Sequence, residues 1–205
     1  MGQKTHPLKI RLNTTQNHQS IWYSKFNNYP ALLEQDSIIR NFLFQTFKLD
    51  SLSDIFIHRN YEFKNIKIEI STAKPWNIVS YGLGKLQKTL RHLLNVNKVR
   101  IAIIPIYTPN TDANLIAEYV CDQLAKRVAF KRVMREVIKR AQLENVQGIK
   151  IQISGRLNGA EMARREWLKE GRMPLQTLRA TIAYSSKRSK TIYGIMGVKI
   201  WIFSG

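Results

Sequence analysis

Alternation of branched apolar residues with polar ones is the feature that most restricts how this chain can fold. The alternating stretches cover residues 66–70, 99–103, 149–153, 178–184 and 198–202. Successive side chains of a β-strand point to opposite faces of a sheet, so a period of two predicts strands that are buried on one side. The short apolar run at 52–58 predicts one more strand. Each such sheet needs a second layer to cover its apolar face.

Apolar residues spaced three and four positions apart predict the helices that supply this layer. The predicted helices cover residues 29–47, 85–94 and 113–124, with a further one containing Phe130 to Ala141. Pro75 predicts a break, followed by a short helical turn and a bend at Gly82. The element order is helix, strand, strand, helix, helix, strand, and then two helices followed by strands. This order predicts an α+β protein.

Domain boundaries follow from composition. Residues 1–16 are polar and basic and contain Pro7, so we expect an extended amino-terminal arm. Residues 107–112 have the composition of a linker. We therefore expect one domain over 17–107 and a second over 108–205.

The charge of the chain points to a polyanionic partner. Lys and Arg total 33 against 14 Asp and Glu, which gives a net charge of +19. Residues 126–205 contain 18 of these bases and only 5 acids, so most of the excess belongs to the second domain. Like charges oppose compact folding, and a strongly basic protein of this kind typically binds nucleic acid.

The strongest local signal is a basic helix between Lys126 and Arg140, where Glu136 is the single acid. Cations recur at every fourth residue from Arg127 to Lys139, which predicts one charged face opposite the apolar stripe. Such a row destabilises an isolated helix unless an anion binds it. Solvated helix faces usually mix charges of both signs, so RNA contact is favoured over a merely solvated face.

Two further clusters carry weaker signals. Arg156, Arg164, Arg165 and Arg172 alternate with acids that would form surface ion pairs of little consequence. A basic group after residue 186 is expected in a turn between strands, where cations suit phosphate contacts. The full set of candidate RNA-binding residues is Lys126, Arg127, Lys131, Arg132, Arg135, Lys139, Arg156, Arg164, Arg165, Arg172, Lys187, Arg188 and Lys190. The aromatic residues near these charges are interpreted mainly as core or interface residues, with stacking on unpaired bases as the alternative.

Other chemistries find no support. Cys121 is the single cysteine, which excludes a disulfide framework and a cysteine-clustered zinc site. The segment from Val79 to Leu86 fails the Walker pattern, because Gly is needed at 79 and Ser or Thr at 86. No Ser, His and Asp grouping suggests a triad, and the four histidines lack ligand spacing. We expect no catalysis, no metal and no cofactor. No apolar run reaches the length of a membrane span.

A family resemblance rests on three long runs. They are GIKIQISGRLNGAE at 148–161, PLQTLRA at 174–180 and TIYGIMGVKIWIF at 191–203, together with MGQKTHPL at the start. The chain resembles the family of the third small-subunit ribosomal protein, in its plastid form. The resemblance implies a K-homology domain of the second topological type, followed by a domain of two helices on a four-stranded sheet.

The resemblance also implies a role in the head of the small ribosomal subunit, at the mRNA entry channel. The implied partners are small-subunit rRNA, incoming mRNA, and the tenth and fourteenth small-subunit proteins. Lys131, Arg132 and Arg135 match the positions that face mRNA in the family. The G-x-x-G loop, which clamps RNA in K-homology domains, is degenerate here because Tyr81 stands at its first glycine.

The degenerate loop resembles plastid members, so the resemblance implies the plastid stroma, with a bacterial cytoplasm as the alternative. The opening residues have no signal or transit character, which predicts synthesis inside the organelle. Two rival functions remain: a free RNA chaperone, and a nuclease, which would need a cluster of acids or histidines.

Overall fold

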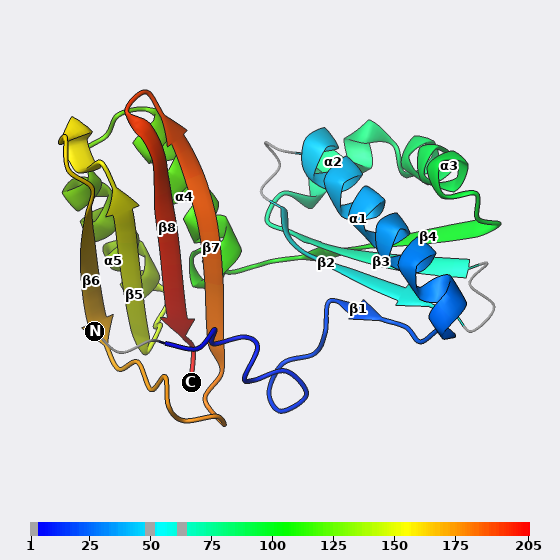
Figure 1. Cartoon of the computed structure of the whole chain (residues 1–205), viewed down its shortest axis with the longest axis horizontal. Coiled ribbons are helices and arrows are strands. Elements are labelled where there is room, and N and C mark those ends of the chain that lie inside the picture. Colours follow the sequence, from blue (N-terminus) through cyan, green and yellow to red (C-terminus); the bar gives the residue numbers. More distant parts are fainter. Residues whose placement is uncertain (1–3, 48–51, 61–64) are drawn as a thin grey trace. The chain divides into compact units, whose positions relative to one another are not determined.

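The computed structural model describes residues 4–47, 52–60 and 65–205, and the chain divides into two compact units. The first unit comprises residues 18–107, and the second comprises residues 1–17 with 108–205. Each unit has one four-stranded sheet covered by helices (Figure 1). The α+β class expected from the alternating patterns is confirmed.

The first unit is built on the sheet β1-β2-β3-β4, here called the first sheet. Strands β2 and β3 are antiparallel, whereas β1 pairs with β2 and β4 with β3 in parallel. Its elements are β1 (Ser20–Ile21), η1 (Phe26–Asn28), α1 (Tyr29–Thr46), β2 (Leu52–Arg59), β3 (Asn65–Thr72), α2 (Pro75–Tyr81), α3 (Leu83–Leu94) and β4 (Lys98–Pro105). From α1 onward this is the expected order of helices and strands.

One face of the first sheet is covered by α1, α2 and α3 (Figure 1). Ile57, Ile68 and Val99 project from the strands into a core that also receives Ile39 of α1 and Leu90 of α3. The alternating residues predicted to be buried therefore do form the core. Helix α3 begins at Leu83, two residues earlier than expected, directly after Gly82 with its φ of 94°.

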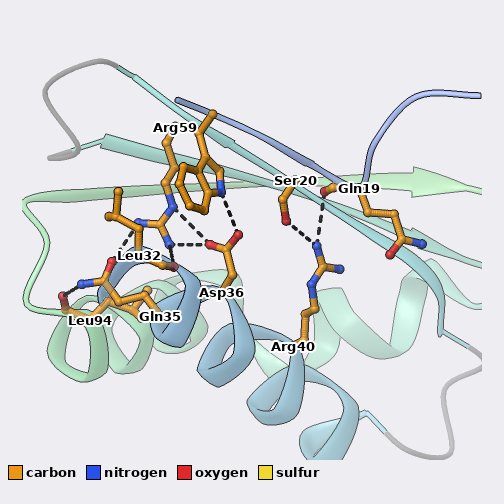
Figure 2. Close-up of polar contacts among 9 residues, drawn as sticks. Gln19, Ser20, Leu32, Gln35, Asp36, Arg40, Arg59 and Leu94 are labelled. Atoms are coloured by element: carbon orange, nitrogen blue, oxygen red, sulfur yellow. Dashed lines mark hydrogen bonds and ion pairs between the residues drawn. The ribbon is translucent and has the colours of Figure 1, made fainter. Parts of the chain in front are cut away.

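A buried ion pair fastens α1 to β2 in this unit (Figure 2). The Arg59 guanidinium lies 2.5 Å from Asp36 Oδ1, and Nη1 donates to Gln35 Oε1 at 2.8 Å. The indole Nε1 of Trp22 donates to Asp36 Oδ2 at 2.8 Å. Arg40 donates to Ile55 O and to Ser20 Oγ, which attaches β1. Asp36, Arg40 and Arg59 thus find their partners within the first unit.

The second unit has the antiparallel sheet β6-β5-β8-β7, here called the second sheet, with α4 and α5 on one face (Figure 1). Its elements are η2 (Pro109–Thr111), α4 (Ala113–Ala125), α5 (Phe130–Leu143), β5 (Gly148–Gly155), η3 (Leu157–Gly159), β6 (Arg164–Gly171), β7 (Ile182–Thr191) and β8 (Gly194–Phe203). Asp112 caps α4 by accepting from the backbone N–H groups of Asn114 and Leu115. The core lies between these helices and the alternating residues of β5 and β8.

The amino-terminal segment does not take the extended form expected for residues 1–16. In its described part, backbone N–H groups of residues 11 to 16 donate to carbonyls of residues 8, 11 and 16, so the segment turns repeatedly. Arg11 is fully buried and donates to the carbonyl oxygens of Pro7, Leu175, Thr177 and Ala180. These long-range bonds join the segment to the loop before β7.

The same bonds explain why the strand predicted over 178–184 starts only at Ile182. The carbonyls of Thr177 and Ala180 are bound by Arg11 and do not take part in the sheet. Residues 178–180 form a turn instead. A guanidinium 166 to 169 residues away in the chain thus outweighs the local alternation.

Candidate nucleic-acid interface

Helix α5 separates apolar from basic side chains as predicted. Val133, Met134, Val137, Ile138 and Ala141 are buried against the second sheet. On the outer side, the basic residues Lys131, Arg132, Arg135, Lys139 and Arg140 are exposed. The apolar stripe holds the helix on the sheet, so the positive side chains project from a rigid element.

Among the residues that the structure describes, only one of these cations forms an ion pair. Arg140 lies 2.6 Å from Glu136 Oε1, and its guanidinium is 4.4 Å from the centre of the Tyr119 ring. The Tyr119 hydroxyl donates to the same carboxylate, and this hydrogen bond, with the nearby Arg140, lowers the pKa of Glu136. Glu136 therefore stays ionised and is occupied by these two groups.

The remaining four, Lys131, Arg132, Arg135 and Lys139, form no ion pair with any residue that the structure describes. They form a row of positive charge along α5, in which Arg132 is close enough to Glu136 to help lower the pKa of that carboxyl. A row of this kind is suited to bind the phosphates of a nucleic acid, because each phosphate replaces a repulsion between neighbouring cations by an attraction.

Arg127 does not belong to the helical row, contrary to the prediction. It lies in the link between α4 and α5, with a φ of 62°. Its backbone N–H donates to Leu124 O, and that of Val128 donates to Gln123 O, so the chain closes α4 here and changes direction. Lys126, the C-cap of α4, is in the same link. The predicted helix from 126 to 140 is therefore shorter and begins at Phe130.

Arg127, Arg156 and Arg164 come together at the start of α5. Arg127 and Arg156 line a hollow of about 290 Å³, together with Phe130 of α5 and Tyr193 from the turn between β7 and β8. Arg156 donates to Ala160 O at 2.9 Å, which holds its side chain beside the Tyr193 ring. The Arg164 guanidinium lies 5.9 Å from the centre of the Phe130 ring. This group extends the positive surface of α5.

The basic group at 187–190 lies within strand β7, and the expected turn occurs later, at residues 192–193. Alternation along β7 divides the group. Lys187 points to the helices, where its Nζ lies 3.0 Å from Glu118 Oε1 of α4. Arg188 and Lys190 are exposed on the opposite side of the sheet. Sequence proximity thus did not indicate which of these cations share a surface.

Strand β6 likewise places the arginines of the predicted cluster at 156–172 on different sides of the sheet. Arg164 is on the helix side, Arg165 is on the other side, and Arg172 follows the end of the strand, where its N–H donates to Gln147 O. The sequence did not predict the strand at residues 164–171, because this edge strand is mostly exposed and lacks apolar alternation. It also did not single out Lys150 and Lys199, although the alternation of the neighbouring isoleucines predicts their common face.

The described part of the chain contains no candidate metal centre. Its His, Cys, Asp and Glu residues form no group of three that could hold a metal ion. Burial raises the pKa of the Cys121 thiol to about 11, so the thiol is protonated at neutral pH. None of its helices is long and apolar enough to span a membrane.

Comparisons with known proteins agree with this geometry. The family described as "Ribosomal protein S3, C-terminal domain" matches residues 120–202. Proteins named small ribosomal subunit protein uS3c from Rhodomonas salina and Cyanophora paradoxa are each 47% identical to all of this chain, which covers 95% and 94% of their lengths. The uS3 protein of the cyanobacterium Thermosynechococcus vestitus is 44% identical over the whole chain and 87% of its own length. The chain therefore belongs to the ribosomal protein S3 family, in its plastid type.

Proposed function

We propose that this structural, non-enzymatic protein is a constituent of the small ribosomal subunit of a plastid, where it binds small-subunit rRNA and contacts incoming mRNA. Its position would be the head of the subunit, beside the mRNA entry channel. The observation that carries the proposal is the row of Lys131, Arg132, Arg135 and Lys139 on α5, which forms no ion pair in the described chain.

Phosphate binding by this row acts through counterion release and through geometry. Each neutralised phosphate frees condensed counterions, so affinity for duplex falls with log salt by about 0.9 per contact. If the protein engages about five phosphates with its basic surfaces together, the slope would be roughly −4 to −5. Because the apolar side of α5 is buried from Phe130 to Ala141, its cations hold bound phosphates at defined positions. Translocation by the ribosome would supply the work of unwinding, while these cations hold the separated strand.

The first unit is proposed to be a K-homology domain of the second topological type with an altered loop. The order α1-β2-β3-α2-α3-β4, with β3 and β4 parallel, supports this fold. Tyr81 ends α2 just before Gly82, and its ring packs edge-on against Phe47 at 5.3 Å. A bulky ring at this position keeps a nucleic-acid backbone from approaching closely. We therefore assign RNA binding mainly to the second unit.

Protein neighbours in the subunit are proposed to be its tenth and fourteenth proteins, and the compartment to be the plastid stroma. Sedimentation tests the assembly. The protein should migrate with small subunits in gradients at high magnesium concentration. A free RNA chaperone would stay at the top of the gradient, and that result would overturn the ribosomal assignment.

The mRNA contact is tested with ribosomes that carry the triple variant Lys131→Ala, Arg132→Ala, Arg135→Ala. Translation through a stable mRNA hairpin should slow, because the strand that emerges from the helix is held less firmly. Translation of an unstructured message should keep its rate. Elongation is followed on both messages at several salt concentrations.

Arg135→Ala and Arg140→Ala form a matched pair of single variants on the same helix. Arg140 is held by Glu136 and Tyr119, whereas Arg135 has no described anionic partner. Loss of Arg135 should therefore slow hairpin passage more than loss of Arg140. Equal effects, or unchanged passage in the triple variant, would contradict the proposed mRNA contact.

A further inference from the structure

The second sheet has a face that α4 and α5 do not cover, and Figure 1 looks onto it with these helices behind. Contacts identify the residues on each side. Glu170 of β6 accepts from Gln142 of α5, and Ser189 of β7 donates to Cys121 O of α4, so these positions point to the helices. Strand alternation then directs their neighbours to the other side. We call that side the open sheet face, formed by Lys150, Gln152, Arg165, Trp167, Lys169, Tyr184, Ser186, Arg188, Lys190, Lys199 and Trp201.

The open sheet face carries six cations and no acid. They are Lys150, Arg165, Lys169, Arg188, Lys190 and Lys199. None of the six forms an ion pair with any residue in the described ranges. The acids of these strands, Glu166 and Glu170, are on the helix side. Separation of charge between the two sides of one sheet leaves this face strongly positive.

The positive charge of this face affects the pKa of Lys150. Its pKa is lowered by burial and by the nearby cations Lys4 and Lys169. The pKa of His6, whose ring packs against Tyr184 at 4.7 Å, is likewise lowered by burial and by Lys9 and Lys199. Burial is the larger cause of both shifts, and the nearby cations add to it in the same direction.

Aromatic rings alternate with these charges across the strands. The Lys150 ammonium lies 5.4 Å from the centre of the Trp167 ring and 5.2 Å from that of Trp201. Trp201 is buried and packs against Tyr184 with the two rings tilted to each other, but Trp167 is 58% exposed on the edge strand β6. Lys150 thus holds the exposed Trp167 ring in place from one side.

Described segments of the chain lie over one end of this face. His6 packs against Tyr184, and Met173 and Leu175 of the loop before β7 pack against the cluster of Ile182, Trp201 and Phe203. Beyond that end, Arg165, Lys169, Arg188, Lys190 and Lys199 are exposed. Four strands spaced about 4.8 Å apart make a surface roughly 14 Å across between β6 and β7. This width accommodates a short single-stranded segment.

We propose that the open sheet face binds unpaired RNA nucleotides, with a base stacked on Trp167 and phosphates held by Arg165, Lys169, Lys199 and Arg188. Exposed aromatic rings on a positively charged four-stranded sheet are an established way to bind single-stranded RNA. An acidic polypeptide would match the charge but would leave the flat Trp167 ring unused. The second unit would then hold RNA on two opposite surfaces, α5 and the open sheet face. This inference rests on the proposed function and names a further binding surface for it.

The test uses the full-length protein and a short unstructured oligonucleotide that contains 5-bromouridine. Irradiation should cross-link the oligonucleotide to Trp167, as identified by mass spectrometry. Trp167→Leu should lower affinity on the order of 10-fold, the loss expected for one stacked base, whereas Trp167→Phe should retain most of it. Circular dichroism checks folding, which this exposed edge position should leave intact. Lys150→Met, which keeps the apolar stem, should weaken binding less than Trp167→Leu.

Separate variants distinguish this inference from the proposed function. The triple alanine variant on α5 should keep the cross-link to Trp167, and the wild-type protein should bind two short oligonucleotides. If the α5 variant loses all binding while Trp167→Leu loses none, the open sheet face is not an RNA site and the α5 assignment stands. If neither variant changes binding, both proposals fail. Binding of polyglutamate with the same dependence on Trp167 would assign the face to a protein and overturn the inference.

Discussion

The two sheets of this protein differ in the charges on the faces that helices do not cover. On the first sheet, Glu69 lies 2.6 Å from Lys67 Nζ and 3.7 Å from His58 Nε2, so an acid is placed among the bases. On the open sheet face of the second unit, six cations surround two tryptophans without an acid. Both sheets have four strands and helices on one side, although the first contains parallel pairs and the second is antiparallel. The contrast in charge is therefore one of surface chemistry.

This contrast extends to the interiors and helices. In the first unit, the buried Arg59 is paired with Asp36, so its charge contributes to holding the fold together. In the second unit, Lys131, Arg132, Arg135 and Lys139 of α5 and the cations on the open sheet face form no ion pair with a described residue. Charges with internal partners serve stability, and charges without them are available to an external polyanion. Substitutions in the two units should therefore affect different measurements.

The largest expected effect is on the stability of the first unit. Asp36→Ala leaves the Arg59 guanidinium buried without a counter-charge, which should cost about 3–5 kcal/mol of unfolding free energy. Denaturant unfolding measures this loss. RNA affinity, measured where both units remain folded, should not change. Trp22→Phe, which removes one hydrogen bond to Asp36, should cost only about 1 kcal/mol, and a similar cost for both variants would contradict the comparison.

The second expected effect is on RNA binding by the second unit. The triple alanine variant at residues 131, 132 and 135 should make the salt dependence of binding to single-stranded RNA shallower by about 2, because three phosphate contacts are lost. Its unfolding free energy should stay within about 0.5 kcal/mol of the wild type. Filter binding at several salt concentrations and thermal unfolding give the two numbers. A large loss of stability would show that these cations have internal partners after all.

The third prediction concerns the pKa of His6. Burial, Lys9 and Lys199 lower this pKa, which favours the neutral ring in the folded protein. The contribution of His6 to folding should therefore be complete above its ordinary value of 6.5 and decline as pH falls toward the lowered value. NMR titration should show the pKa rise when RNA binds beside Lys199. Lys199→Ala should raise it without RNA, and an unchanged value in both experiments would count against a positive cluster here.

The smallest expected effect is that of Glu69→Gln on the first sheet. The hydrogen bond from Lys67 holds the pKa of Glu69 below its ordinary 4.5. Its ion pairs therefore stabilise the protein above that pH, and this contribution is lost as pH falls through the lowered pKa. At neutral pH the substitution should cost less than about 1 kcal/mol. Unfolding of both proteins between pH 7 and pH 3 should show the difference vanish in acid, and a difference that persists would exclude this origin.

Much of the fold could be predicted because its signals are local. The alternation around Ile68 and Ile151 identified central strands, and the spacing from Phe130 to Ala141 identified the buried side of α5. The sequence contains no such local pattern for the edge strand β6 or for the hydrogen bonds of Arg11. The exposed side of β6 contributes little to a core, and Arg11 acts on carbonyls more than 160 residues away.

By itself, the sequence determined that this chain forms two half-buried sheets, that its charge is strongly positive, and that the basic side chains of α5 oppose an apolar stripe. These properties depend on periods of two and 3.6 residues and on simple composition. Only the tertiary structure decided that Lys187 turns to Glu118, that Arg127 leaves the helical row, and that Lys150 joins Trp167 and Trp201 on one face. The physical reason is that an anionic partner or a shared surface depends on which distant segments the fold brings within a few ångströms.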